Sequence, residues 1–410
     1  MSIDLSPMLR TRSGVHATPL PGHKLQRRVH ATPLPGHKLQ RRVQSMLDLA
    51  DIQINGKRPW DIQVLNPDFY ARLLSKGSMG LGESYMDGWW ECEQLDEFIS
   101  RALMLDLDKH LHHAGMLWSV FKANLLNLQN ERRAWQVGRE HYDLGNALFE
   151  HMLDPYMAYS CGYWRHANSL DEAQAHKLDL ICQKLQLEPG MRLLDIGCGW
   201  GSLMRYAAEH YQVECVGLTI SKEQAAWGRD KCADIPVQFE LIDYRNFNRD
   251  GFQKFDRIAS VGMFEHVGYK NYLTFFEVAK RSLKKEGLFL LHTIGRNASN
   301  YPLDPWVNKY IFPNGELPSV KDISEFSEPF FVMEDLHNFG ADYDKTLLAW
   351  YHNFRASWPN IRGDYNERFY RMWRYYLLAC AGNFRARGIQ LFQAVFSHRG
   401  VSGGYSRPML

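Results

Sequence analysis

The sequence predicts an α/β protein built on a seven-stranded, Rossmann-like sheet, preceded by a small, mainly helical domain. Short apolar runs alternate with helical patterns through the second half of the chain, which indicates a doubly wound parallel sheet. A turn with three glycines, Gly197, Gly199 and Gly201, separates a strand pattern from a helix pattern. The connection at 295–329 is too long for a simple loop, so we expect a structured insertion that covers a substrate at the carboxyl edge of the sheet.

The main domain is expected at 142–398, followed by a short tail at 399–410. Each predicted strand is a short, mostly apolar run, and each predicted helix has apolar residues three and four positions apart. The strands are expected at 192–196, 214–220, 237–242, 255–261, 287–294, 330–336 and 389–396. The helices are expected at 202–211, 221–233 and 271–283.

A small domain is expected at 44–128, joined to the main domain by a polar linker at 129–141. Its aromatic stretch at 81–92 is either core or an interaction face, and core is the commoner fate of such residues. Segment 111–128 has helical spacing and either lies on a membrane or packs on a neighbouring helix. The predicted elements are helices at 44–50 and 68–75, a strand at 61–65, and loops around Gly77, Gly80 and Gly82.

A basic tail is expected at 1–43. The stretch VHATPLPGHKLQRR at 15–28 recurs unchanged at 29–42, and its Pro and Gly content disfavours a packed element. Residues 1–45 hold eight Lys and Arg against one acid, a formal charge of +7. Because the whole chain has a net charge of +2, the remaining residues carry a formal charge of −5. We interpret the segment as disordered, either without a role or weakly attracted to anionic lipid.

Composition is that of an ordinary soluble globular protein, with 45% hydrophobic and 23% charged residues. The sequence has neither a run of apolar residues long enough to span a bilayer nor a secretory signal at its start, so a cytoplasmic location is expected. The seven cysteines are scattered without C-x-x-C pairs, which predicts reduced thiols and neither a disulfide framework nor a metal site.

The glycine turn predicts a cofactor site. Its pattern, D-x-G-x-G-x-G starting at Asp195, differs from the G-x-G-x-x-G of dinucleotide sites and is typical of S-adenosylmethionine sites. Because that cofactor carries an ammonium group instead of a pyrophosphate, a carboxylate at the turn is useful. The candidate residues of the turn are Leu194, Asp195, Ile196, Gly197, Cys198, Gly199, Trp200, Gly201 and Ser202.

The next two strand ends extend this site. We expect Gln224, one helical turn after the second strand, to bind the ribose hydroxyls, with Glu223 less favoured. Asp243 and Tyr244 follow the third strand and suit the adenine end, although Asp243 could instead belong to a plain surface loop. The segment after the second strand contributes Thr219, Ile220, Ser221, Lys222, Glu223 and Gln224.

Polar residues after the fourth and fifth strands are candidates for the chemistry. Glu265 and His292 should face one pocket, where Glu265 suits acid-base or anion-organising work, or only braces the loop. The N/D-P-P-Y turn of enzymes that methylate amines on nucleic acid is missing here. Aromatic residues around the pocket would stabilise a passing cation and exclude water.

These motifs together resemble bacterial cyclopropane-fatty-acyl-phospholipid synthases over about 47–396. The resemblance implies a class I methyltransferase sheet and methyl transfer from S-adenosylmethionine to a cis double bond of a phospholipid acyl chain. A bound bicarbonate would then remove a proton so that the ring closes. The motifs that carry the resemblance are GLGESYMDGWW at 80–90, EHYDLGN at 140–146, YSC at 159–161, LDIGCGWG at 194–201, GMFEHVG at 262–268, LLHTIG at 290–295, NFGADYD at 338–344 and ACAG at 379–382.

The resemblance also implies roles for individual residues and partners. Cys161, Glu265, His292, Tyr343 and the backbone of Ile294 would hold the bicarbonate, while Tyr159, Ser160 and the segments named above would bind the cofactor. Cys380 matches a family cysteine once proposed as a nucleophile, although direct methyl transfer to an alkene requires no thiolate. The family further implies a homodimer that visits the inner face of a bacterial membrane and binds no nucleic acid.

Two other functions remain open from the sequence. A lipid or sterol C-methyltransferase would keep the fold and the cofactor but stop without closing a ring. A non-catalytic lipid-binding protein would carry a vestigial cofactor site, which the intact glycine turn disfavours.

Overall fold

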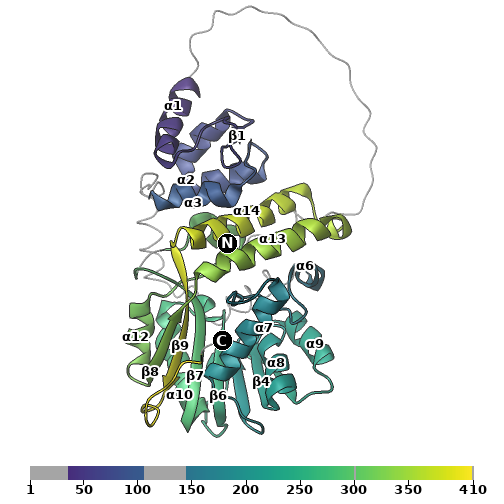
Figure 1. The fold of residues 1–410 in the computed structure, drawn as a ribbon, viewed down its shortest axis with the longest axis vertical. Helices are drawn as coiled ribbons and strands as arrows, with labels where there is room; N and C mark the ends of the chain where they lie inside the picture. Colours follow the sequence, from purple (N-terminus) through teal and green to yellow (C-terminus); the bar gives the residue numbers. More distant parts are fainter. Residues whose placement is uncertain (1–35, 106–144, 300–301, 409–410) are drawn as a thin grey trace, which may run out of the picture.

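The computed structural model describes residues 36–105, 145–299 and 302–408 (Figure 1). Three predictions concern residues outside these ranges: the first 35 residues of the basic tail, the amphipathic segment at 111–128 and the linker at 129–141. All seven predicted strands of the main domain lie inside them and are confirmed. The main sheet consists of β3 (Arg192–Ile196), β4 (Glu214–Thr219), β5 (Val237–Leu241), β6 (Phe255–Val261), β7 (Leu283–Arg296), β8 (Val332–Asn338) and β9 (Ile389–Ser397).

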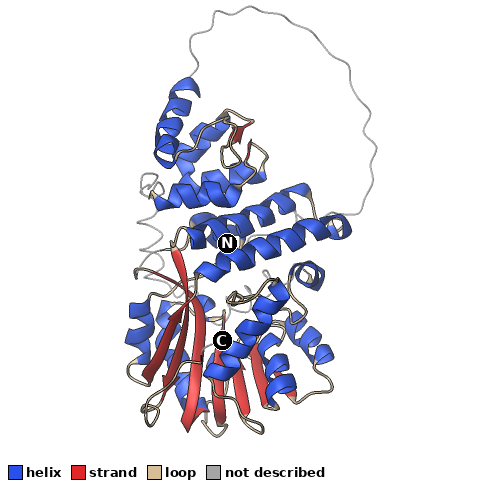
Figure 2. Cartoon of the chain, in the orientation of Figure 1, coloured by secondary structure: helices blue, strands red, loops and turns tan. Residues whose placement is uncertain are grey.

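The order of the sheet is β5-β4-β3-β6-β7-β9-β8. The first five strands of this order are parallel, whereas β9 runs antiparallel to both β7 and β8. Consecutive residues of a strand point to opposite faces, so Leu193 packs in one apolar core and Leu194 in another. Helices cover both faces of the sheet (Figure 2), as the prediction of a doubly wound fold required.

The helices of the main domain divide between the two faces and the carboxyl edge. One face is covered by α7, α8 and α9, and the other by α10 and α12. In Figure 1, α13 and α14 lie between the sheet and the N-terminal helices. Their bounds are α6 (Asn146–Met152), α7 (Leu170–Lys184), α8 (Ser202–Tyr211), α9 (Lys222–Lys231), α10 (Tyr272–Ser282), α11 (Pro305–Tyr310), α12 (Val320–Ser327), α13 (Ala341–Ile361) and α14 (Glu367–Arg385). Short 3-10 turns follow two strands, η4 (Tyr244–Asn246) after β5 and η5 (Phe264–His266) with η6 (Tyr269–Asn271) after β6.

The predicted insertion at 295–329 covers the carboxyl edge only in part. Its helix α11 packs against α2 and α14 through Trp306, whose ring centroid lies 4.6 Å from that of Tyr375. Its helix α12 instead packs on α10 and β8, with Ile323 in the core of one sheet face. The remaining cover comes from α13 and α14, which the sequence did not predict.

The N-terminal domain contains α1 (Gly36–Leu47), η2 (Asp48–Ala50), β1 (Gln63–Val64), α2 (Asp68–Met86), β2 (Trp90–Glu91) and α3 (Leu95–Met104). The prediction of disorder up to residue 43 is wrong for its last part, because α1 begins at Gly36. Leu39, Val43 and Leu47 are spaced four residues apart and pack as one stripe on the domain core, which stabilises the helix.

The prediction that Gly80 and Gly82 lie in loops is also wrong. The helical segment bends only at Gly77, where φ is 55° and ψ is −134°, and then continues to Met86. A Cβ atom on Gly82 would lie 2.4 Å from Cδ1 of Trp306, so the missing side chain is what lets α2 approach α11. Close packing here outweighs the low helix propensity of glycine.

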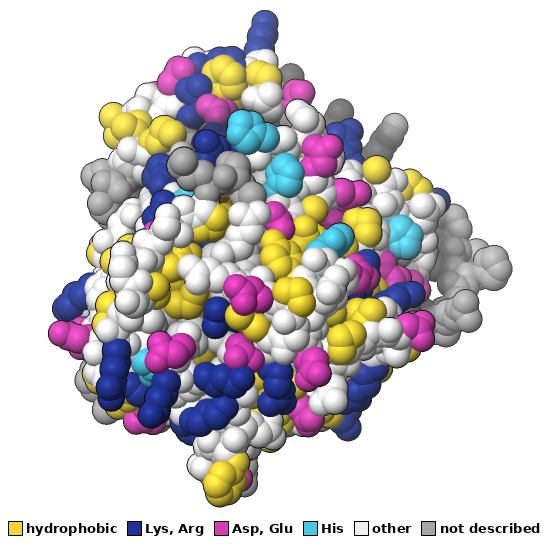
Figure 3. All heavy atoms as spheres, turned by 60° about the horizontal axis from the view of Figure 1, so that its bottom comes forward, with side chains coloured by type: hydrophobic (Ala, Val, Ile, Leu, Met, Phe, Trp, Pro, Cys, Tyr) yellow, Lys and Arg dark blue, Asp and Glu magenta, His cyan; other side chains and the backbone are white. Residues whose placement is uncertain are grey.

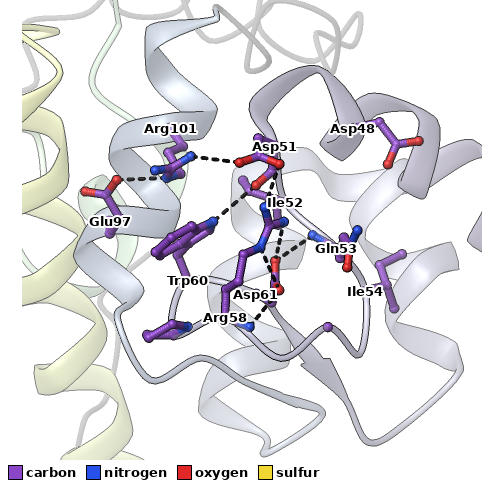
Figure 4. Close-up of polar contacts among 12 residues, drawn as sticks. Asp48, Asp51, Ile52, Gln53, Ile54, Arg58, Trp60, Asp61, Glu97 and Arg101 are labelled. Atoms are coloured by element: carbon purple, nitrogen blue, oxygen red, sulfur yellow. Dashed lines mark hydrogen bonds and ion pairs between the residues drawn. The ribbon is translucent and has the colours of Figure 1, made fainter.

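A charged cluster around Trp60 fixes the loop between η2 and β1 (Figure 4). Arg58 pairs with Asp51 at 2.5 Å and with the buried Asp61 at 2.9 Å. The guanidinium of Arg101, on α3, lies 4.2 Å from the ring centroid of Trp60, and Arg58 lies 5.3 Å from it. The loop is therefore attached to α3 by ion pairs and by stacking of cations on one indole ring.

Ion pairs also attach the N-terminal domain to the helices that cover the sheet. Arg385, near the end of α14, binds Asp96 at 2.7 Å and Glu97 at 3.1 Å on α3, and Asp344 at 3.0 Å on α13. The apolar core of the N-terminal domain continues without a break into α13 and α14. The domain thus shares one core with the cap of the sheet.

Truncation at the N-terminus should distinguish the helical part of the repeat from the part before it. Removing residues 1–42 is expected to lower Tm by several degrees, because it deletes Leu39 and half of α1. Removing only residues 1–35 keeps all of α1, so Tm should change by less than about 1 °C. Thermal unfolding followed by circular dichroism measures both, and equal melting temperatures for the two truncations would contradict a stabilising role for α1.

The surface view in Figure 3, with the lower end of Figure 1 turned forward, shows Lys and Arg sharing one face with Asp and Glu. Within the described ranges, no helix is long and apolar enough to cross a bilayer. All seven cysteines lie in those ranges and are free thiols, as predicted.

Candidate active site

The glycine turn between β3 and α8 has the geometry that the sequence predicted. Gly197, Gly199 and Gly201 have φ values of 87°, 56° and 89°, which disfavour any other residue. A Cβ atom on Gly197 would lie 2.4 Å from Cγ of Met263, and one on Gly201 would lie 2.5 Å from Cζ of Phe239. The turn therefore needs glycine both for its backbone angles and for its close contacts.

A pocket opens at this turn and gathers about half of the predicted cofactor residues. It lies at the carboxyl end of β3. The loop at 157–160, helix α7 and the start of the turn that follows β6 form its boundary. Predicted residues that line it are Tyr159, Ser160, Asp195, Gly197, Cys198, Gly199, Trp200, Ser202 and Gln224. The pocket also takes in Lys177, Val261 and Gly262, which the sequence did not assign to the cofactor.

The other predicted cofactor residues lie behind the pocket or away from it. Leu194 and Ile196 are fully buried in the core of the sheet. Thr219 and Ser221 position the helix that carries Gln224, since the Ser221 hydroxyl caps its backbone N–H and the Thr219 hydroxyl lies 3.3 Å from its side-chain oxygen. Gly201 shapes the turn, Ile220 is half-buried, and Lys222 and Glu223 are exposed.

Asp243 and Tyr244, predicted to contact the adenine, also make contacts within the protein. The Asp243 carboxylate accepts hydrogen bonds from Arg245 at 2.6 and 2.8 Å. Tyr244 is buried, and its ring packs 5.7 Å from that of Phe275 in the core. A contact from the backbone of this segment stays a prediction.

Asp195 is suited to a cationic ligand group. Its side chain is buried at the end of β3, and its Oδ1 atom has no hydrogen-bond partner among the described residues. Burial raises the pKa of Asp195 to about 7, and the neighbouring Lys177 opposes this rise. An ammonium group of a ligand would supply the missing partner, so the carboxylate fits the prediction made for it.

The two ends of the pocket lie on opposite sides of β3. A Cβ atom on Gly199 would lie 4.0 Å from the side-chain nitrogen of Gln224, which belongs to the β4 side. A Cβ atom on Gly262 would lie 3.8 Å from Cβ of Ser160, on the β6 side. A cofactor with its ribose at Gln224 would therefore extend its other end toward β6 and β7.

Glu265 and His292 are the polar residues predicted for that end, and Glu265 contacts β7 two residues after His292. The backbone N–H of Ile294 donates to Oε1 of Glu265 at 2.6 Å, which braces the turn after β6 against β7. The amide of Gln393 lies 3.0 Å from Nδ1 of His292. With the Gln393 amide in this orientation, Nδ1 accepts and the neutral ring carries its proton on Nε2.

Both side chains keep one polar atom available. Oε2 of Glu265 and Nε2 of His292 are buried and have no partner in the described part of the chain. Burial raises the pKa of Glu265 to about 7 and holds the pKa of His292 well below its usual value. The pair can thus offer a neutral N–H donor and a carboxyl group that exchanges its proton near neutral pH.

Tyr343 and Cys161 complete the predicted group. Burial raises the pKa of Tyr343, and the neighbouring Cys161 and Glu265 add to the rise, which places these groups within electrostatic reach of one another. The Cys161 thiol lies 4.0 Å from the hydroxyl of Thr346, one turn after Tyr343 on α13. Tyr343, near the start of α13, therefore lies within electrostatic reach of both Cys161 and Glu265.

Aromatic rings line the same region. The ring of Tyr159 lies 5.1 Å from that of Trp350 and 5.2 Å from that of Phe149, and its hydroxyl lies 2.9 Å from that of Tyr376. Cys380 is partly buried, and burial raises the pKa of its thiol to about 12. In the part of the chain that the structure describes, no group of His, Cys, Asp and Glu could hold a metal ion.

Sequence reasoning missed Lys177, Gln393 and Thr346. A signal for α7, the helix of Lys177, was present: Ser169 accepts from the backbone of Glu172, and the Glu172 carboxylate accepts from the backbone of Asn168. A serine followed three residues later by glutamate predicts such a helix start. That signal does not tell which polar residue of the helix points into a site.

Comparisons with known proteins identify the family of the chain. The family model described as mycolic acid cyclopropane synthetase matches residues 129–394. The chain is 59% identical to the cyclopropane-fatty-acyl-phospholipid synthase of Escherichia coli over 360 residues, which are 88% of this chain and 93% of the relative. It is 32% identical to a probable fatty acid methyltransferase of Pseudomonas putida, over 85% of this chain and 89% of the relative.

Solved structures show the same fold. The cyclopropane synthase MmaA2 from Mycobacterium tuberculosis superposes with a TM-score of 0.60 at 33% identity, over 64% of this chain and 97% of that one. The mycolic acid cyclopropane synthase CmaA1, complexed with SAH and CTAB, gives a TM-score of 0.59 at 35% identity, over 64% of this chain and 97% of that one. S-adenosylhomocysteine (SAH) is the product form of the methyl donor.

Proposed function

Since this chain belongs to the mycolic acid cyclopropane synthetase family of S-adenosylmethionine-dependent methyltransferases, we propose that it is a cyclopropane-fatty-acyl-phospholipid synthase. The proposed substrate is the cis double bond of an unsaturated acyl chain in a phospholipid. The observation that supports this most is the contact of Glu265 with the backbone of Ile294, two residues after His292, with Tyr343 within electrostatic reach of both Glu265 and Cys161. A likeness of 59% that extends through the N-terminal domain also favours a phospholipid substrate.

The residues of the pocket would divide the work of methyl transfer. S-adenosylmethionine, when bound, supplies the methyl group: its carbon leaves the sulfur and bonds to one alkene carbon, so that a carbocation forms at the other. Asp195 and Gln224 hold the two ends of the donor. The rings of Tyr159, Trp350 and Tyr376 exclude water and stabilise the cation through their faces.

Ring closure requires that a proton leave the new methyl group. We propose that Glu265, His292, Tyr343, Cys161 and the backbone of Ile294 would hold a bicarbonate ion, which would supply the proton acceptor when bound. The N–H at Nε2 of His292 can donate to such an anion, and Oε2 of Glu265 can accept from the O–H group of bicarbonate, since each atom lacks a partner among the described residues. The negative charge of the Glu265 carboxylate would also stabilise the carbocation.

The thiol of Cys380 is expected to be dispensable for the chemistry. With its pKa raised to about 12 by burial, almost none of it is thiolate at neutral pH. Cys380→Ser should therefore keep turnover within about threefold of the wild type, measured as incorporation of labelled methyl groups into lipid. Loss of turnover without loss of Tm would instead assign the sulfur a chemical role.

The proposed function is tested with anionic liposomes that contain monounsaturated chains and labelled S-adenosylmethionine, with and without added bicarbonate. Cyclopropane ring protons should be visible by NMR in the extracted lipid, and removal of bicarbonate should lower the rate. A branched methyl product would favour the second candidate, a lipid or sterol C-methyltransferase without ring closure. The presence together of Glu265, His292 and Tyr343 favours ring closure.

We also propose that the enzyme works as a homodimer at the inner face of a bacterial membrane. The proposed substrate chains lie in a bilayer, so the active site must reach them at its surface. The family resemblance supports the dimer. Light scattering in solution and co-sedimentation with liposomes measure the two properties separately.

A further inference from the structure

Lys177 is a buried cation in the wall of the cofactor pocket. It lies in the middle of α7, is 1% exposed, and lines the pocket together with Ser160 and Asp195. Its ammonium group donates a hydrogen bond to the Ser160 hydroxyl at 3.0 Å. None of the functions proposed above uses this charge.

The environment of Lys177 leaves its charge without a direct counter-ion. A buried ammonium group is costly unless it is paired. Among the described residues, no carboxylate forms an ion pair with Nζ; Asp154 acts on it only through space, and its two oxygens accept from the backbone N–H groups of Tyr156 and Ala158. Burial lowers the pKa of Lys177 to about 8, although Asp154, Cys161 and Asp195 oppose the shift.

The pocket therefore presents at one end a cation and an anion that attract each other through space but form no direct ion pair. Lys177 and Ser160 lie on the β6 side, and Asp195 ends β3 beside them with one oxygen unpartnered among the described residues. Gln224, the ribose residue, lies on the β4 side. The part of S-adenosylmethionine that reaches the β6 side is its amino-acid end, which carries an ammonium group and a carboxylate.

We propose that Lys177, together with Ser160, binds the α-carboxylate of S-adenosylmethionine, while Asp195 binds its ammonium group. Each buried charge of the pocket then gains a partner from the zwitterionic end of the ligand. The same anchoring would fix the donor so that its methyl group faces Glu265 and His292. This inference rests on the use of S-adenosylmethionine and does not depend on the lipid substrate or on bicarbonate.

The test compares two ligands that differ only in the carboxylate: SAH and its decarboxylated analogue. Titration calorimetry gives the affinity of each for the wild type and for Lys177→Met, which keeps the length of the side chain but removes its charge. SAH binding should weaken about 10- to 100-fold in the variant, as expected for the loss of a charge-assisted hydrogen bond. Binding of the decarboxylated analogue should change by less than about threefold.

Lys184→Met is the matched control. Lys184 is a second buried lysine of the same helix, but it contacts Asp335 at 3.5 Å and His337 at 3.2 Å and does not line the pocket. Its substitution should leave the ratio of the two affinities unchanged. If Lys177→Met does not fold, Lys177→Gln, which can still donate to Ser160, provides the same comparison.

Two results would overturn the proposal. Equal weakening of both ligands would assign Lys177 a purely structural role, and unchanged binding of both would remove it from the site. Failure of the wild type to bind SAH at all would instead contradict the methyl donor. Failure of the liposome assay alone would contradict the lipid substrate and leave the role of Lys177 standing.

Discussion

Glu265→Gln is expected to lower turnover by about 100- to 1,000-fold while SAH affinity stays within about twofold. The amide oxygen can still accept from the backbone of Ile294, which the carboxylate now does at 2.6 Å, so the turn after β6 should keep its shape. What is lost is the negative charge and the exchangeable proton beside the reacting carbon, and general acid-base groups typically contribute this much. Initial rates on monounsaturated liposomes and calorimetry with SAH measure the two quantities.

The pH profile provides a second readout of the same variant. Burial raises the pKa of Glu265 to about 7, so the carboxylate fraction grows as the pH rises from about 6 to about 8. Turnover of the wild type should rise over this range if the ionised form is the active one. The profile of Glu265→Gln should lack that rise.

Glu316→Gln is the control for this position. The backbone N–H of Glu316 donates to the backbone oxygen of Glu265, but its carboxylate points to the backbone of Tyr269. Turnover should stay within about twofold of the wild type. Near-normal turnover in Glu265→Gln itself would exclude this carboxylate from the mechanism.

Gly197→Ala is expected to weaken SAH binding by at least about 100-fold. At a φ of 87°, an added Cβ costs roughly 1–2 kcal/mol in backbone strain. It would also lie 2.4 Å from Cγ of Met263, so either the turn or Met263 must move. Because Met263 directly precedes the turn that carries Glu265, the displacement would disturb the cofactor site and the catalytic group together.

Gly190→Ala separates strain from steric contact. Gly190 has a φ of 81°, close to that of Gly197, but a Cβ atom there would have no neighbour within 4 Å. This control should lose a similar amount of stability without losing SAH affinity. If both variants bound SAH equally well, the close approach at Gly197 would be irrelevant to the cofactor.

The sheet and much of the site could be predicted because local sequence determines them. The strands are short, mostly apolar runs, and the glycines of the turn are required by backbone angles, so both can be recognised in the sequence. Glu265 and His292 follow strands whose carboxyl ends meet at one edge of a parallel sheet. Their proximity therefore follows from the topology.

The parts that were missed depend on tertiary contacts. Helix α7 buries Gln174, Lys177 and Lys184, and these polar residues interrupt the apolar pattern by which helices are recognised. Gly82 looks like a loop residue until Trp306, more than 200 positions later, is seen to pack on it. The carboxylate of Asp243, expected to contact the adenine, also forms an ion pair with Arg245, which the sequence did not predict.

The position of α14 has a consequence for heat tolerance. Its side chains pack both over the proposed active site and in the core of the N-terminal domain. Arg385 forms ion pairs with residues of α3 and α13 and so links these two parts. Melting of the outer part would remove the cover from the site of the proposed carbocation and admit water. The temperature at which catalysis fails is therefore set by the least stable portion of the whole assembly, even where that portion never touches the substrate.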